Sequence, residues 1–277
     1  MLVDLTIKGF LAETAGSAPV PGGGSISALN GAIATALTEM VANLTIGKKK
    51  YADVEGQMRT IATEATIIRE RLIRDIDRDS EAYDRVFAAF KLPKETEEEK
   101  AERSRVIQDA TKQAAMVPME VAEEIASVME TIIYVAHKGN RNAVTDACVA
   151  MMTARTCVLG ALLNVRINLT SIKDGAFVKR MSEKADFLES EAIRIEKKLL
   201  DWTQEQLKVE SYGKCTLCGG GTADVRTYRR DTDRKYEVGT DPGSEGTHPA
   251  LPRLSGPEDR DTERAALRHH DRLWFLV

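Results

Sequence analysis

Three consecutive glycines, Gly22, Gly23 and Gly24, precede Ser25 and a stretch in which apolar residues recur at helical spacing. Glycine lets backbone N–H groups approach a ligand closely, and the start of a helix carries a partial positive charge. Together these features suit a carboxylate, a phosphate or a developing oxyanion. The spacing matches neither the dinucleotide-binding nor the P-loop glycine pattern, and no strand is predicted before it. The alternative is a turn in which Ser25 serves only as a helix cap.

A second candidate site lies in the sequence GNRNAVTD, at the predicted start of another helix. Asp146 falls in the first turn of that helix, where the helix dipole favours the ionised carboxylate. Such a group can accept a proton or face a cation. Asn140 and Asn142 precede it and offer hydrogen-bond donors and acceptors. The alternative is that Asn142 and Asp146 only cap and stabilise the helix.

Two further groups of polar residues are candidates for substrate binding. Asn164 and Asn168 are four residues apart and share a face if their segment is helical, and their amides match the edge of a heterocycle. Lys48, Lys49 and Lys50 would attract an anionic substrate tail. In the alternative interpretation the asparagines end a helix and the lysines form a solvated charged surface.

The apolar pattern predicts the helices that position these residues. They cover a short lead-in segment within 1–15 and then about 26–44, 53–90, 96–138, 143–163 and 176–209. Pro118 either kinks the third long helix or begins a new one, and residues 164–174 form a connector or continue a helix. No segment alternates convincingly with period two. The sequence therefore predicts an all-α bundle of six or seven mostly long helices.

Composition divides the chain of 277 residues into two segments. Residues 210–277 hold 8 of the 19 glycines and 4 of the 8 prolines, so we predict a helical domain over 1–209 and a largely irregular tail of unknown role. In that tail Cys215 and Cys218 resemble half of a zinc site, but no second pair follows, and we predict no metal.

The net charge of −4 favours neither nucleic acid nor an anionic membrane as a partner. The most apolar stretch, 147–165, carries Arg155 at its middle, which favours a buried helix over a membrane span. We find no secretory signal pattern at the start of the chain. The four cysteines are then expected to be reduced, and the protein to be cytoplasmic.

Five motifs in order, APVPGGGSISAL, NLTIGKKKY, LPKETEEEKAER, KGNRNAVTDACVA and NVRINLTSIKD, resemble the folate cyclodeaminase/cyclohydrolase family. Within that family the likeness is greatest to the stand-alone bacterial cyclohydrolases that act on methenyltetrahydrofolate. The resemblance covers about residues 1–209. It implies an all-helical homodimer that acts on a reduced folate without a metal or redox cofactor. Thr145 and Cys148 depart from the usual serine and glycine of the family, which affects the fine shape of that pocket.

The implied reaction is hydrolysis of 5,10-methenyltetrahydrofolate to 10-formyltetrahydrofolate. Our hypothesis assigns Asp146 to orient water and offset the substrate cation. The other candidates would bind the pterin and water (Asn140, Asn142, Asn164, Asn168), a polar part of the folate (Gly22 to Ser25) and its glutamate tail (Lys48, Lys49, Lys50). The alternatives are a formiminotetrahydrofolate cyclodeaminase, which releases ammonia as it forms the same cation, and a non-enzymatic helical adaptor that dimerises.

Overall fold

The computed structural model describes residues 1–207, and these form six α-helices with no β-strand among them. The helices are α1 (Ile7–Thr14), α2 (Gly23–Asn43), α3 (Glu55–Phe90), α4 (Glu97–Lys138), α5 (Val144–Leu169) and α6 (Gly175–Gln206). Short 3-10 turns occupy Leu2–Asp4, Lys49–Tyr51 and Arg141–Ala143. The predicted all-α fold is confirmed. The predicted boundary at 209, the tail 210–277 and its cysteine pair lie outside the described residues.

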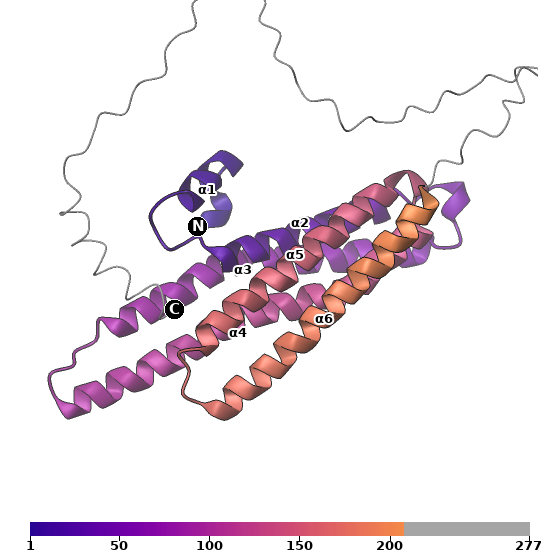
Figure 1. The fold of residues 1–277 in the computed structure, drawn as a ribbon. Coiled ribbons are helices and arrows are strands. Elements are labelled where there is room, and N and C mark those ends of the chain that lie inside the picture. The colour runs from indigo at the N-terminus through magenta and orange to yellow at the C-terminus, as the bar shows by residue number, and fades with distance from the viewer. Residues whose placement is uncertain (208–277) are drawn as a thin grey trace, which may run out of the picture. The chain divides into compact units, whose positions relative to one another are not determined.

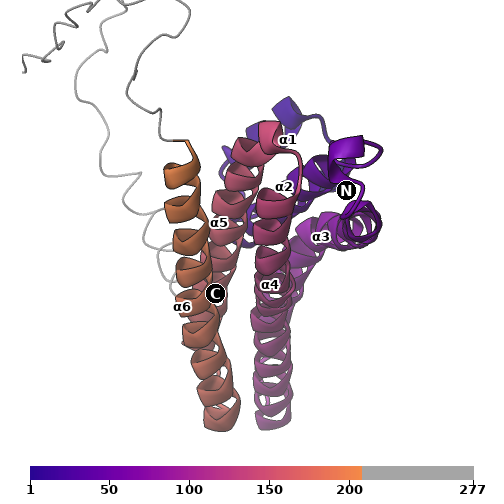
Figure 2. The ribbon, with the colours of Figure 1, turned by 90° about the vertical axis from the view of Figure 1, so that its right-hand side faces the viewer.

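The five long helices form one bundle (Figure 1). Helix α2 packs against α3 and α5, α4 packs against α3 and α5, and α6 covers α5 and α4. Figure 2 shows α6, α5 and α4 side by side along their lengths. The α3–α4 turn and the α5–α6 connection lie at the same end, where Lys112 of α4 pairs with Asp174 ahead of α6 at 2.9 Å.

Local sequence signals explain most helix boundaries. Thr96 and Glu99 form a complete capping box at the start of α4, as their spacing predicts. Helix α4 continues through Pro118, which is buried inside it, so no new helix begins there. The prediction of Asn142 as the N-cap of α5 is wrong: Ala143 occupies that position without a side-chain cap, and Asn142 lies in the preceding 3-10 turn.

Helix α5 ends at Leu169, six residues beyond its predicted end. The two asparagines that suggested a connector instead continue the helix, because their side chains bond backward within it. The Nδ2 of Asn164 donates to the carbonyl of Gly160 at 2.8 Å, and that of Asn168 donates to the carbonyl of Asn164 at 2.9 Å.

Small residues let α2 enter the core. A Cβ on Gly31 would lie 2.9 Å from a side-chain carbon of Ile125 and 3.0 Å from the sulfur of Cys157, so these helices touch at backbone distance. Val41 of α2 is fully buried, but some of the larger apolar residues of this helix reach the surface, and Ile33 is 43% exposed. Exposed apolar residues of α5 join them, among them Leu163, which is 64% exposed.

We refer to this surface as the α2–α5 apolar face; its exposed members are Ile33, Met40, Leu44, Val149, Met152, Leu163 and Ile167. By length and composition Arg141–Leu169 would suffice to cross a membrane, but half of its most apolar window is buried inside the bundle. Since α5 is packed by α2, α4 and α6, it is a core helix of the bundle with one exposed apolar side.

Candidate active site

The residues predicted to form one site lie at two separate places. Asp146 stands in the first turn of α5 and Asn164 stands 18 residues later on the same helix. At 3.6 residues per turn they share one side of α5, five turns and about 27 Å apart. The glycines lie near Asn164, whereas the lysines and Asn140 lie near the start of α5. Within one chain they do not converge.

Close approach explains the glycines. Helix α2 begins at Gly23, with Gly22 in extended conformation as its N-cap. A Cβ on Gly24 would lie only 2.1 Å from Oδ1 of Asp79, and a Cβ on Gly23 would lie 3.0 Å from Nδ2 of Asn164. The glycines therefore let α3 and α5 bring a carboxylate and an amide directly against the start of α2.

Ser25 lies inside α2 and is buried, so it is not the helix cap. Its hydroxyl donates to the carbonyl of Ile76 at 2.9 Å and lies 3.1 Å from Oδ2 of Asp79 and 3.1 Å from the hydroxyl of Ser80. These contacts hold the start of α2 against α3. They also orient the carboxylate of Asp79 at that helix start.

Asp79 is the residue that the sequence analysis missed. Its carboxylate is half-buried, and burial raises its pKa, an effect that the side chain and backbone of Ser25 partly oppose by hydrogen bonding to the ionised form. A sequence signal for it exists: Asp79 lies three residues after Ile76 and four before Tyr83, on the stripe of α3 that is predicted to be apolar. A carboxyl group on a core stripe needs a specific partner, and here that partner is Ser25.

Of the two predicted asparagines on α5, only Asn164 joins this group, which we call the glycine-helix site: Gly22, Gly23, Gly24, Ser25, Asp79 and Asn164. Asn168 is buried one turn away, where its amide also donates to the carbonyl of Ala114 at 3.2 Å. Its Oδ1 is buried and accepts no hydrogen bond from the described residues. Asn168 thus ties α5 to α4.

The remaining candidates form a second group, the α5-start cluster: Lys48, Lys49, Lys50, Asn140, Asn142 and Asp146. Asn140 is buried, receives Asn142 N–H on its Oδ1 at 3.2 Å, and donates from its backbone to Thr45 at 2.8 Å. Its contacts join the end of α2 to the start of α5. The three lysines and Asn142 are exposed, and Asp146 is half-buried.

Tyr51 connects the lysines to this cluster. Its hydroxyl accepts a hydrogen bond from the backbone N–H of Arg141 at 3.1 Å, and this bond together with the nearby lysines lowers the tyrosine pKa. Of the two departures from the family pattern, Thr145 is exposed, whereas Cys148 is buried and its thiol lies 3.2 Å from the hydroxyl of Thr203 on α6. The larger side chain at 148 therefore packs between α5 and α6.

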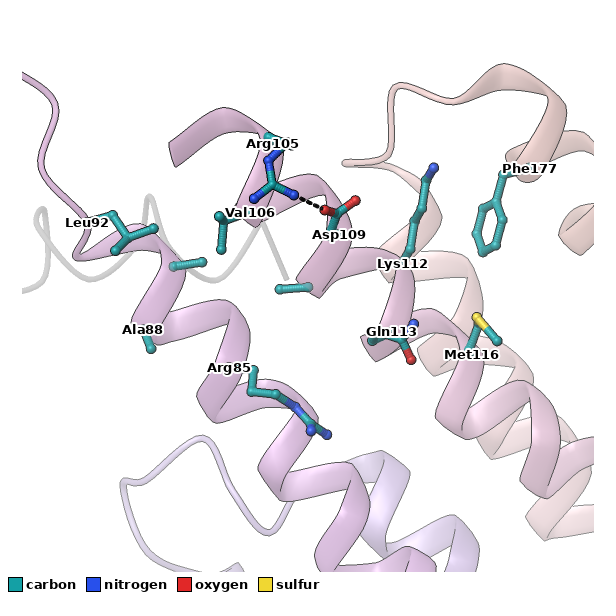
Figure 3. Close-up of a pocket in the computed structure, with 12 residues that line it drawn as sticks. Arg85, Ala88, Leu92, Arg105, Val106, Asp109, Lys112, Gln113, Met116 and Phe177 are labelled. Carbon is teal, nitrogen blue, oxygen red and sulfur yellow. Dashed lines mark hydrogen bonds and ion pairs between the residues drawn. The ribbon is translucent and has the colours of Figure 1, made fainter. Parts of the chain in front are cut away.

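An open cavity of about 710 Å³ lies between α3 and α4, with Phe177 at its edge (Figure 3). Arg85, Asp109 and Lys112 line it, and none of the predicted site residues does. On α3, Arg85 follows Asp79 by six residues, about 120° around the helix, so the cavity opens on a different face from the carboxylate. It is not continuous with the glycine-helix site.

The fold and the glycine-helix site together define a class of protein: an all-helical bundle with a half-buried carboxyl group and an amide at the start of a buried helix. Such sites between helices bind small molecules. Among residues 1–207 no three His, Cys, Asp or Glu side chains are grouped so that they could hold a metal ion.

Comparison with known proteins identifies the family. The family model described as formiminotransferase-cyclodeaminase matches residues 6–187, and the chain belongs to this family. A methenyltetrahydrofolate cyclohydrolase of Methylorubrum extorquens is 39% identical over 202 residues, which cover 73% of this chain and 97% of that protein. The mouse formimidoyltransferase-cyclodeaminase is 32% identical over 191 residues, covering 69% of this chain but only 35% of that longer protein.

A solved structure has the same fold. The formiminotetrahydrofolate cyclodeaminase of Thermotoga maritima matches with a TM-score of 0.67 and 32% sequence identity, over 74% of this chain and 99% of that one. The resemblance inferred from the five sequence motifs is therefore confirmed.

Proposed function

We propose that the protein is an enzyme that hydrolyses 5,10-methenyltetrahydrofolate to 10-formyltetrahydrofolate. Its 39% identity to a bacterial methenyltetrahydrofolate cyclohydrolase, over almost all of that protein's length, supports this reaction. The structural observation that carries it is the half-buried Asp79, with a raised pKa, held by Ser25 against the glycine start of α2.

The chemistry requires a group that can move one proton. The substrate carries a delocalised cation over N5, the bridge carbon and N10. Water adds to the bridge carbon and loses one proton, which gives a neutral carbinol adduct. The bond from that carbon to N5 then breaks as N5 gains a proton, and the carbinol hydroxyl loses its own proton to become the formyl oxygen, so one proton is released overall. No metal or redox cofactor is needed, because the bridge carbon is already electrophilic. One carboxyl group can accept the first proton and return it to N5.

Asp79 fits this role better than Asp146. Burial raises the pKa of Asp79, which makes its carboxylate a stronger base, and Ser25 holds that carboxylate at the start of α2. While ionised, Asp79 also offsets the charge of the substrate cation. Asn164, beside Gly23, would orient the pterin edge or the attacking water with its amide. The partial positive charge at the start of α2 favours an oxygen that gains negative charge.

A homodimer offers a role for the α5-start cluster. The α2–α5 apolar face is exposed in the single chain, and large exposed apolar surfaces mark interfaces. A second copy packed antiparallel about a twofold axis near the middle of α5 would bring Asp146 of one protomer opposite Asn164 of the other. We propose that Asp146, Asn140, Asn142 and the three lysines act on substrate only in this way. A cytoplasmic location also belongs to the proposal.

The alternative function is cyclodeamination of formiminotetrahydrofolate. The similarity to the Thermotoga maritima and mouse proteins favours it. In that reaction N10 attacks the formimino carbon and ammonia leaves, so a proton again moves between two nitrogens and the same carboxyl group serves. Absorbance loss of the methenyl cation, measured beside ammonia release from the formimino substrate, separates the two. A non-enzymatic adaptor would show neither activity and no stabilisation by folate.

The variant Asp79→Asn tests the proposed site. It keeps the shape of the side chain but cannot carry the proton, and general acid–base catalysis contributes about 10²- to 10⁴-fold. We expect kcat for methenyltetrahydrofolate hydrolysis to fall by at least about 10²-fold, with the variant still folded and its melting temperature no lower than that of wild type. Asp77→Asn, two residues away on α3, is the matched control. A native kcat in Asp79→Asn would contradict the assignment.

A further inference from the structure

A row of aromatic and basic side chains follows Asp79 along α3 and is displaced around the helix by about 40° for every four residues. Tyr83, Phe87 and Lys91 follow at intervals of four residues and therefore lie on one side of the helix. The rings of Tyr83 and Phe87 are stacked, with centroids 6.4 Å apart and an angle of 13° between their planes. The Nζ of Lys91 lies 4.1 Å from the centroid of the Phe87 ring. Phe87 is nonetheless 41% exposed, so this aromatic surface is open to a ligand.

Helix α4 supplies a second cation beside this row. The guanidinium of Arg103 lies 5.6 Å from the centroid of the Phe90 ring, and its Nη2 donates to the Phe90 carbonyl at 3.0 Å. Its Nε is buried and has no hydrogen-bond partner among the described residues. Since Phe90 follows Phe87 by three residues, Arg103 approaches the same side of α3.

Neither cation is neutralised. Within residues 1–207, Lys91 and Arg103 form no ion pair with a carboxylate, whereas nearby Arg78 and Arg105 each bind two. Two basic groups, one beside the exposed ring of Phe87 and one beside the partly buried ring of Phe90, match a ligand that combines an aromatic ring with carboxylates. The row also has the right reach, because eight residues of helix place Phe87 about 12 Å along α3 from Asp79.

We propose that this surface, Tyr83, Phe87, Phe90, Lys91 and Arg103, binds the aminobenzoyl-glutamate arm of the folate. The inference rests on the proposed function. With the bridge carbon at Asp79, the aminobenzoyl ring, which is bonded directly to N10, lies against Tyr83. The amide that follows the ring reaches Phe87, and the glutamate carboxylates reach Lys91 and Arg103. Lys48, Lys49 and Lys50, to which the sequence assigned the tail, lie at the other end of the same chain.

Steady-state kinetics on the full chain test this assignment. The variants are Lys91→Ala, Arg103→Gln and Phe87→Ala, and Arg85→Ala is the matched control because it is a cation on a different face of α3, lining the cavity of Figure 3. For each variant, KM and kcat with methenyltetrahydrofolate are measured together with the inhibition constant of p-aminobenzoyl-glutamate. Melting temperatures identify any variant that fails to fold, and Lys91→Ala removes only an exposed side chain.

We expect Lys91→Ala and Arg103→Gln each to raise KM by about two- to fivefold, the range of a partly exposed ion pair, with kcat within about twofold of wild type. Phe87→Ala should raise KM by about two- to tenfold through loss of the ring contact. The inhibition constant should rise by the same factors. Arg85→Ala should leave KM, kcat and the inhibition constant unchanged.

Unchanged KM and inhibition constants in all three variants would overturn the proposal. An increase in KM for Arg85→Ala alone would also overturn the proposal, because that result would place the arm in the cavity of Figure 3. An increase in KM that is confined to a triple alanine variant of Lys48, Lys49 and Lys50 would place the arm at the α5-start cluster and would overturn the proposal as well. A wild-type chain inactive on both folate substrates would refute the proposed function, a result distinct from all of these.

Discussion

The substitution Gly24→Ala tests how closely α2 must approach Asp79. The new Cβ would lie 2.1 Å from Oδ1 of Asp79, whereas ordinary contact begins at 3.4 Å. The carboxylate must therefore retreat by about 1.3 Å or the helices must separate, which costs about 1–3 kcal/mol in a packed region. Since a displacement of about 1 Å at a reacting group can lower a rate by 10²-fold, we expect kcat to fall by about that factor.

The assay follows loss of methenyl absorbance and the melting temperature in parallel. Gly56→Ala is the matched control, because a Cβ there meets nothing within 4 Å, and the change should stabilise α3 by about 0.5–1 kcal/mol without altering kcat. If Gly24→Ala acts through Asp79, adding it to Asp79→Asn should lower kcat little further. A native kcat in Gly24→Ala, or full additivity in the double variant, would refute the reasoning.

Three further predictions address the pKa of Asp79, the assembly of the dimer, and Cys148, which replaces the usual glycine of the family. Because burial raises the pKa of Asp79 above its unfolded value, the ionised form disfavours folding, and this cost grows as the pH rises from the unfolded pKa to the raised folded pKa. Asp79→Asn should therefore melt above wild type at neutral pH, and the difference should shrink as the pH falls from the raised pKa to the usual aspartate value; a constant difference over that interval would argue against a raised pKa. If each site combines Asp79 of one protomer with Asp146 of the other, inactive Asp79→Asn and Asp146→Asn dimers should regain roughly a quarter of native activity after mixing and exchange, since half of the dimers then hold one intact site. No recovery, despite mass-spectrometric evidence of mixed dimers, would place both residues in separate roles. Cys148→Gly should lower stability by about 1–2 kcal/mol in urea unfolding, through lost packing against Thr203 and lower helix propensity, while leaving kcat within about twofold; a large change in kcat would mean that residue 148 shapes the site.

Sequence alone predicted the helices well where local signals agree. The capping box at Thr96 and the apolar period of 53–90 correspond to the observed α4 and α3. The end of α5 could not be predicted, because asparagine amides bond equally well to a turn or to the preceding helical carbonyl, and the choice depends on neighbours such as Ala114.

The faces of α2 show a different limit. Its large apolar residues recur at helical spacing, and small residues recur on the opposite side of the helix. In the structure Gly31 contacts Ile125 and Cys157 inside the bundle, while Ile33 is exposed. Periodicity identifies two faces of a helix but does not say which one is buried. Here the face with the small residues is buried, because small residues let the helix backbones come close together.

The candidate site likewise depends partly on features that the sequence determines and partly on the tertiary structure. The sequence by itself determined the all-helical fold and the family, because both depend on the order of residues along the chain. Only the tertiary structure brought Asp79 of α3 and Asn164 of α5 against the glycines that begin α2. Contacts between residues that are distant in sequence depend on how the helices pack against one another, and the order of residues along the chain does not specify that packing.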